Sequence, residues 1–163
     1  YVDKDGEKLS INWLTYPTRL EQPKLAEYAQ ATLKDIGIDV QVNNTSDHRT
    51  FAENGDFDVY VSSTTTAPTG DPEYFFTSTV VGSKNYGKYQ NDEVTKLTEK
   101  LHQTFDKDER GKLAVELQQD ILDDDAFFFV SHLNMGIVTK SNVKGMAAHP
   151  CDYYEITADL DVE

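Results

Sequence analysis

The most constraining feature of the sequence is a strand–helix–strand pattern at its start. Apolar and polar residues alternate over Lys8–Thr15, which is typical of a β-strand. Pro23 stands where the first turn of a helix tolerates proline, and apolar residues at helical spacing follow it as far as Ile36. Gly37 is a natural helix stop, and alternation over residues 38–42 predicts a second strand. Two strands joined through a helix are expected to be parallel neighbours.

The rest of the chain continues to mix helices and strands. Asn91 or Asp92 is expected to cap one helix, and Asp106 with Glu109 forms a capping box for the next. The further helices are expected at 46–54, from about residue 71, at 92–105 and at 106–121, and the further strands at 57–62, 126–130, 135–139 and 152–157. The predicted fold class is therefore α/β, with a mixed β-sheet flanked by helices. The length of 163 residues predicts a single domain.

The acidic charge of the chain narrows the classes of partner. The formal net charge is −14 at pH 7. This charge disfavours nucleic acids and anionic membranes, because phosphate groups need a basic surface. It is consistent with a cationic partner, but a solvated acidic surface that aids solubility is the commoner explanation.

Cysteine content and apolar runs bear on the compartment. The single cysteine, Cys151, rules out an internal disulfide, which fits a cytosolic protein and a disulfide-free extracytoplasmic one equally well. No apolar run reaches the length that spans a bilayer, and no signal peptide is present. Because the sequence starts with Tyr-Val-Asp and enters a strand almost at once, we expect a piece of a longer protein.

Motifs of the common enzyme classes are missing from the sequence. It contains no GxGxxG, GxxxxGK[ST], HExxH, CxxC or GxSxG, so no catalytic residue is assigned and no enzyme is expected. His149 and Cys151 could reach one metal ion, with His132 as a third candidate, but a closed site needs four ligands. An ordinary loop is the better interpretation, so no metal-binding residue is assigned. The run Asp123–Asp125 lacks the spacing of a calcium loop and is expected to be a solvated helix end.

The best candidate for a ligand-binding surface begins where the third strand ends. Four hydroxyl residues and an Ala-Pro-Thr-Gly turn follow this strand, which places Thr65, Thr66 and Ala67 in a polar loop at the edge of a sheet. No side chain of a catalytic type stands in the loop. The pattern therefore favours a surface that holds a ligand over one that reacts with it.

Aromatic residues and amides follow this loop. Tyr74 lies on a short predicted helix and either faces a cleft or packs in the core with its two phenylalanine neighbours. Asn85 and Tyr86 lie in a Gly/Asn/Tyr loop, where such residues supply adaptable hydrogen bonds and flat contact area. The alternative for this loop is a structured turn whose tyrosines pack on the next helix.

Several segments, in their order and spacing, resemble one known family. They are LSINWLTYPTRLEQPKLAEYAQATLKDIGIDVQV, GDFD, APTGDPEYF, NYGKYQNDEVTKL, TFDKDERGKLAVELQQDILDDDAFFFVSH and VTKSNVKG. Together they resemble the C-terminal lobe of the dipeptide/oligopeptide/nickel solute-binding proteins, the family 5 extracytoplasmic receptors of ABC importers. The resemblance extends over essentially the whole chain, so residues 1–163 are expected to be one lobe of a two-lobed periplasmic-binding-protein-like fold.

The resemblance implies a function and a set of partners. Members of the family close on a ligand like a hinged clamp and deliver it to a membrane permease. The implied partners are the N-terminal lobe of the same protein, the ABC permease subunits and a small-molecule, metal-chelate or peptide ligand, with no nucleic acid. The implied location is extracytoplasmic, either periplasmic or lipid-anchored at the outer face of the cytoplasmic membrane. No cofactor is implied apart from nickel or a metal chelate as the transported ligand.

Within the family, the tail HPCDYYEITADLDVE and the APTGDP loop look more like the nickel or metallophore branch than the peptide branch. Gly70 and Lys84-Asn85 stand at about the places where enteric nickel receptors carry a tyrosine and a histidine, so a metal already held by a small chelator is the expected ligand. The Lys84 ammonium would pair with a chelator carboxylate, the Asn85 amide would hydrogen-bond and the Tyr86 ring would form a wall. A di- or oligopeptide bound along the Ser62–Ala67 backbone is the alternative. Two further hypotheses place the chain outside this family, as a stand-alone enzyme or as a structural interaction domain.

Overall fold

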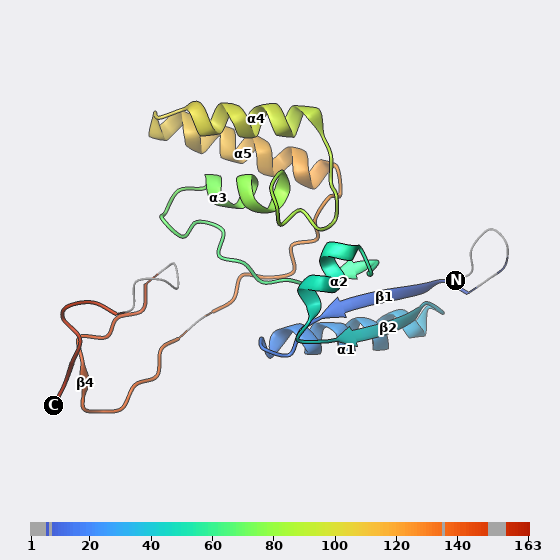
Figure 1. The fold of residues 1–163 in the computed structure, drawn as a ribbon, viewed down its shortest axis with the longest axis horizontal. Helices are drawn as coiled ribbons and strands as arrows, with labels where there is room; N and C mark the ends of the chain where they lie inside the picture. Colours follow the sequence, from blue (N-terminus) through green and yellow to red (C-terminus); the bar gives the residue numbers. More distant parts are fainter. Residues whose placement is uncertain (1–5, 7, 135, 150–155) are drawn as a thin grey trace. The chain divides into compact units, whose positions relative to one another are not determined.

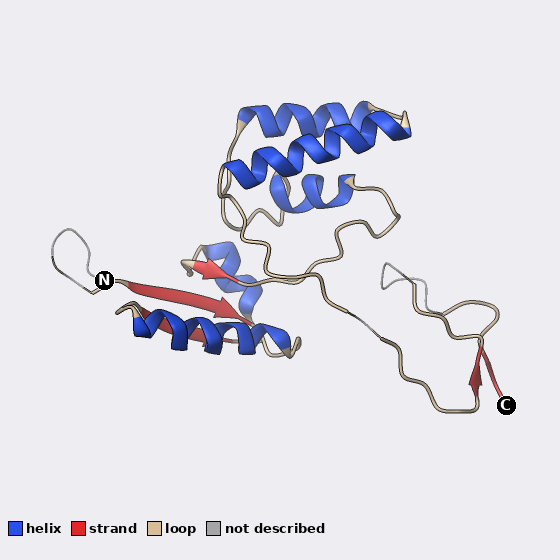
Figure 2. Ribbon diagram, turned by 180° about the vertical axis from the view of Figure 1, so that it is seen from behind, coloured by secondary structure: helices blue, strands red, loops and turns tan. Residues whose placement is uncertain are grey.

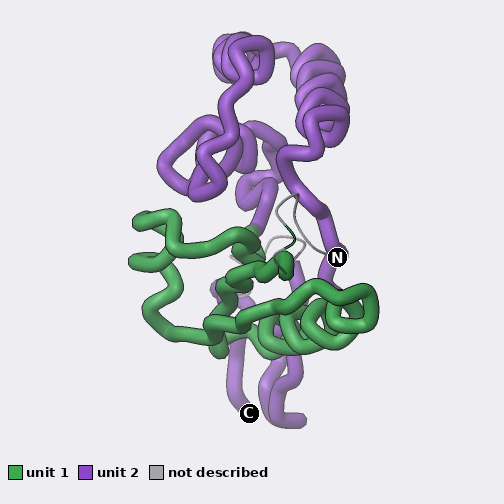
Figure 3. Tube along the Cα trace, turned by 90° about the vertical axis from the view of Figure 1, so that its right-hand side faces the viewer, with its two compact units in different colours: residues 1–64 green, residues 65–163 purple. Residues whose placement is uncertain are grey.

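The structure of the protein is a computed structural model, and it describes residues 6, 8–134, 136–149 and 156–163. The chain divides into two compact units, residues 1–64 and residues 65–163, shown in green and purple in Figure 3. Buried side chains occur in both units, so each unit has a core of its own.

The first unit contains the predicted strand–helix–strand pattern (Figures 1 and 2). Strand β1 spans Ser10–Thr15, helix α1 spans Glu21–Asp35 and strand β2 spans Asp39–Asn44. β1 and β2 pair in parallel from Ser10 opposite Asp39 to Thr15 opposite Asn44. The parallel pairing that the sequence predicted is therefore confirmed.

Helix α2 (His48–Asn54) and strand β3 (Val59–Tyr60) complete this unit. β3 pairs in parallel with β1, so β1 is the central strand of a sheet with the order β2-β1-β3. The regular part of β3 is shorter than the predicted 57–62. Backbone hydrogen bonds on both sides of it still follow β1, from the Asp58 amide to the Asn12 carbonyl and from the Val61 amide to the Leu14 carbonyl.

The core of the first unit lies around the central strand. Leu14 and Thr15 are adjacent in β1, so their side chains point to opposite faces of the sheet, and both are fully buried. Burial on both faces is characteristic of a parallel strand covered by helices. α1 packs on β2 and β1, and α2 packs on β1.

The second unit begins with the short aromatic helix that the sequence predicted. Helix α3 (Glu73–Phe75) continues directly into the π-helical turn η1 (Phe76–Val80). Inside this segment the Thr77 hydroxyl donates to the Glu73 carbonyl at 3.1 Å and the Ser78 hydroxyl donates to the Tyr74 carbonyl at 2.6 Å. Hydroxyl groups that bond into the preceding turn compete with the regular i→i−4 pattern, which accounts for the wider turn.

Helices α4 (Asp92–Gln103) and α5 (Lys107–Asp123) lie side by side (Figure 1). Their predicted N-caps are confirmed: the Asn91 side chain accepts from the amides of Glu93 and Val94, and the Asp106 side chain accepts from the Glu109 amide. α3 packs on α4. The core of the unit is formed by Phe75, Phe76, Val80, Val94, Leu101, Leu113, Ala114, Leu117 and Ile121.

Two of the predicted strands are wrong. Residues 126–130 and 136–139 form no strand among the residues that the structure describes. The side chains of this segment alternate in direction, as in an extended chain. The rings of Phe127 and Phe129 contact Phe75, whereas Phe128 is 90% exposed. A strand needs a neighbouring strand to complete its hydrogen bonds, and apolar composition alone does not supply one.

The end of the second unit carries a small antiparallel pair. β4 (Val143–Lys144) pairs with β5 (Asp161–Val162). The α/β class is therefore confirmed, with parallel and antiparallel pairings in separate sheets. Most of the predicted tail strand, 152–155, lies outside the described residues. Within the described part of the chain, no helix combines the length and the apolar character needed to cross a membrane.

Candidate ligand-binding site

The polar loop after β3 carries the first three candidate residues. Thr66 is exposed, and Thr65 and Ala67 are half-buried. The Gly70 amide donates to the Ala67 carbonyl at 3.0 Å, which closes the predicted turn. Gly70 has φ +79°, a left-handed conformation that glycine adopts without strain. The loop therefore turns at Ala67–Gly70 and leads directly into α3.

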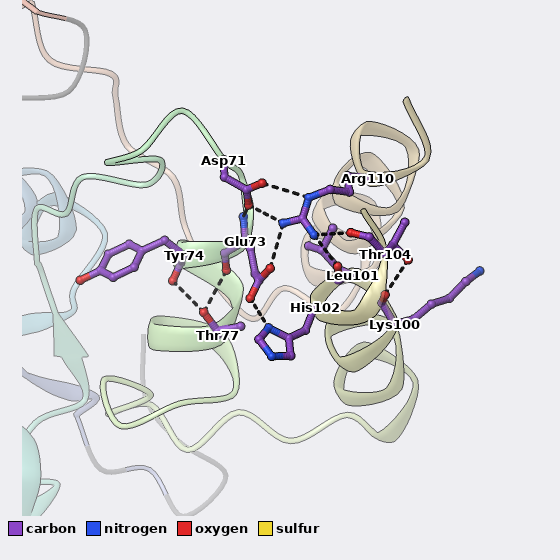
Figure 4. Close-up of polar contacts among 9 residues, drawn as sticks. All are labelled: Asp71, Glu73, Tyr74, Thr77, Lys100, Leu101, His102, Thr104 and Arg110. Carbon is purple, nitrogen blue, oxygen red and sulfur yellow. Dashed lines mark hydrogen bonds and ion pairs between the residues drawn. The ribbon is translucent and has the colours of Figure 1, made fainter. Parts of the chain in front are cut away.

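Tyr74 separates from its aromatic neighbours, as one of the two sequence interpretations proposed. Phe75 and Phe76 are buried in the core, whereas Tyr74 is half-buried. Figure 4 shows its ring pointing away from the polar cluster on the other side of α3. The Tyr74 side chain therefore remains accessible for a contact outside the core.

The structure brings Lys84 to Tyr74. The Lys84 ammonium donates to the Tyr74 hydroxyl at 3.0 Å and lies 5.3 Å from the centre of its ring. The Lys84 amide donates to the Ser78 carbonyl at 2.9 Å, which fixes the start of the loop to η1. Lys84 is exposed, so its charge remains available to an anion from solution.

Asn85 has a local role that the sequence did not predict. Its amide nitrogen donates to the Tyr89 carbonyl at 2.8 Å, and its amide oxygen accepts from the Tyr89 amide at 3.0 Å. These bonds close the loop that carries Tyr86, which is half-buried. Asn85 therefore shapes the loop, and removing its side chain would disturb more than a ligand contact.

A second network holds the far end of the same loop. The hydroxyl of Tyr89 and the side-chain amide of Asn91 both donate to one carboxylate oxygen of Asp124, at the end of α5. Burial, together with the hydrogen bond to the Asp124 carboxylate, raises the pKa of Tyr89 to about 12. The hydrogen bond from Tyr89 in turn lowers the pKa of Asp124. Asp124, which the sequence suggested was only solvated, therefore connects this loop to the helix pair.

Arg110 of α5 holds α3 in place (Figure 4). Its Nε and Nη2 atoms donate to the two carboxylate oxygens of Asp71 at 2.9 and 2.6 Å, and Nη2 also donates to Glu73 at 2.8 Å. Its Nη1 atom donates to the carbonyls of Leu101 and Thr104 at 2.7 and 2.6 Å. A single side chain thus joins the start of α3 to the end of α4.

The charges in this cluster compensate one another. The hydrogen bonds from Arg110 lower the pKa of both Asp71 and Glu73, and those carboxylates raise the pKa of Arg110. Glu73 also bonds Nδ1 of His102 at 2.6 Å. Because every charge here has a partner, the cluster is suited to supporting α3 rather than to binding an ion.

Sequence reasoning missed Arg110 and Glu73 as supports for the candidate site. Arg110 lies 39 residues from Asp71, so no local pattern connects them. The available signal was the acidic residue at the expected start of this helix, Asp71: its carboxylate accepts from the Glu73 amide at 2.9 Å, and Arg110 binds the same carboxylate.

A shallow hollow lies beside α3, and Tyr74 belongs both to its lining and to the pair with Lys84. The hollow has a volume of about 300 Å³ and is lined by Thr69, Asp71, Glu73, Tyr74, Thr77 and Arg110. No group of three or more His, Cys, Asp or Glu side chains suited to a metal occurs among the described residues. Cys151 lies outside them, so the His149–Cys151 pair stays undescribed.

Relatives of the chain include a nickel-binding protein and an oligopeptide-binding protein. It is 26% identical to the nickel-binding protein NikA of Staphylococcus aureus over 98% of its length, and 27% identical to the oligopeptide-binding protein AppA of Bacillus subtilis over 95%. The chain spans about a third of the length of each of these curated relatives, namely 34% and 30%.

Solved structures give the same two kinds of relative. A nickel ABC transporter protein from Bacillus halodurans is 33% identical over 74% of this chain and 26% of its own, with a TM-score of 0.65. AppA of Bacillus subtilis, in complex with a nonapeptide, is 27% identical over 91% of this chain and 31% of its own, with a TM-score of 0.76. NikA of Staphylococcus aureus, in complex with Ni(L-His)2, has the same fold, with a TM-score of 0.78 over 99% of this chain and 35% of its own at 24% identity.

The family itself is identified by a direct match. Residues 1–87, which are more than half of the chain, match the family described as bacterial extracellular solute-binding proteins, family 5 middle. This range contains the first unit, the polar loop, Tyr74 and Lys84. The chain belongs to the family 5 bacterial extracellular solute-binding proteins.

Proposed function

We propose that this chain is a lobe segment of the substrate-binding component of an ABC importer, and that the importer takes up nickel or a metal–chelator complex. The observation that carries the proposal is the 33% identity to a nickel ABC transporter protein, together with the similarity to NikA over almost the whole chain. The importer function requires no bond to be made or broken, so no enzyme activity and no resident cofactor are part of it.

The Lys84–Tyr74 pair supports a chelated rather than a bare metal. An anionic chelator carboxylate would accept from the Lys84 ammonium, and the Tyr74 hydroxyl and ring stand beside that position. Lys84 is exposed, and in a chain whose net charge is −14 an anionic ligand needs such a local cation to offset the repulsion from the surrounding carboxylates. Thr65, Thr66, Ala67 and Tyr86 complete the proposed contact surface.

Capture in this proposal is non-covalent. The ligand would bind between this lobe and an N-terminal lobe of the same protein, and it would stabilise the closed state that the permease recognises. The protein would act outside the cytoplasm, in agreement with the extracellular description of its family.

A peptide ligand is the second candidate, and one structural observation favours it. Among the residues that the structure describes, no backbone hydrogen bond to another strand engages Ser62, Thr64, Thr65 or Thr66. An extended peptide could therefore pair with this segment by strand addition. AppA, which was solved with a nonapeptide, shares the fold over 91% of this chain.

The first experiment is native mass spectrometry of the full-length protein, purified gently and without added chelators. A bound mass containing nickel, cobalt or zinc with a small organic chelator would support the metal-chelate proposal. A ladder of peptide masses without metal would favour the peptide alternative and remove the role proposed for Lys84.

The role of Lys84 is tested by Lys84→Ala in the full-length protein. We expect this change to weaken binding of Ni²⁺ with L-histidine about tenfold, because a charge-assisted hydrogen bond is lost. Isothermal titration calorimetry measures the affinity. Lys112→Ala, which removes the same charge from an exposed position 76% accessible on α5, is the control and should leave the affinity unchanged. Equal affinities for Lys84→Ala and the wild type would contradict the proposed site.

A further inference from the structure

Three aromatic side chains gather at one edge of the parallel sheet in the first unit. Tyr16 directly follows β1, Tyr60 ends β3, and His48 begins α2. Leu14 pairs with Tyr60 in the parallel register, so the carboxyl ends of β1 and β3 meet at this edge. In open α/β sheets, ligands bind beyond the carboxyl ends of the strands.

The three rings are packed together by direct contacts. The Tyr16 ring stacks on His48 with centres 4.1 Å apart and planes inclined by 23°. Nδ1 of His48 lies 2.6 Å from the Tyr60 hydroxyl. Burial, with a smaller contribution from Arg49, lowers the pKa of His48, which favours the neutral form of the ring. The stack is therefore a well-packed aromatic platform at the end of the sheet.

The Tyr16 hydroxyl reaches from this platform to the polar loop. The Ser63 amide donates to it at 3.2 Å, across 47 residues of sequence. Tyr16 is only 7% exposed, and its hydrogen bond with the Ser63 amide is partly buried. Val61 is the last residue after β3 whose backbone amide is hydrogen-bonded to β1. Two residues later, the Ser63 amide is bonded to the Tyr16 hydroxyl instead.

We propose that Tyr16 is a positioning residue for ligand binding: its hydroxyl fixes the direction in which the chain leaves β3, and thereby holds the backbone of Ser62–Thr64, the start of the segment that would pair with a ligand. The proposal rests on the proposed function, because it assigns these residues to the ligand surface. Tyr16 does not itself need to touch the ligand. The same anchor would serve a chelate and a peptide, since both would use the loop.

The test is Tyr16→Phe in the full-length protein, because it keeps the ring stack and removes only the hydroxyl. Hydrogen exchange followed by mass spectrometry, without any ligand, reports on the amides of Ser62–Ala67. We expect exchange of the Ser63 amide, which donates to the Tyr16 hydroxyl, to become about five- to tenfold faster, as for the loss of one hydrogen bond. The affinity for Ni²⁺ with L-histidine, or for a nonapeptide, should fall by a similar factor while the unfolding temperature stays nearly constant.

Two further variants separate positioning from general stability. Tyr28→Phe on α1, where the side chain is 73% exposed, removes a hydroxyl without touching the loop and should change none of these values. Tyr16→Leu also removes the ring stack, and it should lower the unfolding temperature as well as speed loop exchange.

The outcomes distinguish this proposal from the proposed function. Unchanged loop exchange in Tyr16→Phe would overturn the anchor. If Tyr16→Phe exchanges faster but binds its probe (Ni²⁺ with L-histidine, or a nonapeptide) as tightly as the wild type does, the role of Tyr16 in ligand binding is overturned. Failure of the wild type to bind either probe would overturn the proposed function, and the exchange comparison would still decide whether Tyr16 holds the loop.

Discussion

Arg110 shows how one side chain can fix the geometry of several segments. Its five N–H groups make five hydrogen bonds, two to Asp71, one to Glu73 and two to backbone carbonyls at the end of α4. Its side chain is 14% exposed, so these bonds are shielded from water. The last carbonyls of a helix have few donors within the helix, and Arg110 adds one to the Leu101 carbonyl and one to the Thr104 carbonyl just beyond the end of α4.

Arg110→Met is expected to lower the free energy of unfolding at pH 7 by about 3 kcal/mol, because two carboxylates and two carbonyls each lose a charged hydrogen-bond donor. Chemical denaturation measures this value. Arg49→Met, on the exposed surface of α2, is the control and should cost much less.

The pH dependence gives a second readout of the same change. Asp71 and Glu73 have lowered pKa values in the folded protein, against 3.8 and 4.5 as ordinary values. Their contribution to stability is therefore present above those ordinary values and is lost as the pH falls through the lower, folded ones. Arg110→Met should lose less stability than the wild type between pH 7 and pH 3. An equal loss in both proteins would contradict the role of the cluster.

At the scale of elements, the exit from η1 depends on a glycine. A Cβ atom on Gly82 would lie 2.0 Å from the Thr77 carbonyl oxygen and 2.9 Å from that of Ser78. Both are backbone atoms, which cannot move aside as the end of a side chain can. The close return of the chain here is what allows the Lys84 amide to bond Ser78.

Gly82→Ala is expected to destabilise the second unit by several kcal/mol, because the clash forces the backbone of η1 to shift. Gly111→Ala is the matched control. Gly111 lies inside α5, and nothing stands within 4 Å of its added Cβ, so alanine should stabilise the helix by about 0.5–1 kcal/mol. Thermal unfolding of both variants measures the difference. A Gly82→Ala protein as stable as Gly111→Ala would contradict the close packing around η1.

At the scale of the whole molecule, the net charge of −14 is the dominant electrostatic property. Such an excess keeps a protein soluble and also destabilises its folded state through self-repulsion. The Arg110 cluster is shielded and locally compensated, so salt should affect it less than the exposed carboxylates.

Raising the NaCl concentration from 10 to 200 mM at pH 7 is therefore expected to raise the midpoint of thermal unfolding by a few degrees, since screening weakens the repulsion. The same measurement near the isoelectric point, at about pH 4.5, serves as the control because the net charge is then close to zero. A fall in the midpoint with salt at pH 7 would mean that attractive ion pairs outweigh the repulsion.

The sequence by itself determined the local elements and the family. The strand–helix–strand unit, the caps at Asn91 and Asp106 and the turn at Ala67–Gly70 were all predicted and are present. Each depends on periodicity or on hydrogen bonds within a few residues, so each is encoded where it occurs. The order of these signals also carried the family resemblance.

Only the tertiary structure decided which distant groups meet. The pairs Arg110–Asp71, Tyr89–Asp124 and Tyr16–Ser63 each join residues more than 30 positions apart, and nothing in the local sequence selects one partner over another. For the same reason the apolar run 126–130 was predicted as a strand but packs Phe127 on Phe75 instead. Propensity and apolarity are properties of a segment, whereas a strand or an ion pair exists only when a partner is brought within bonding distance.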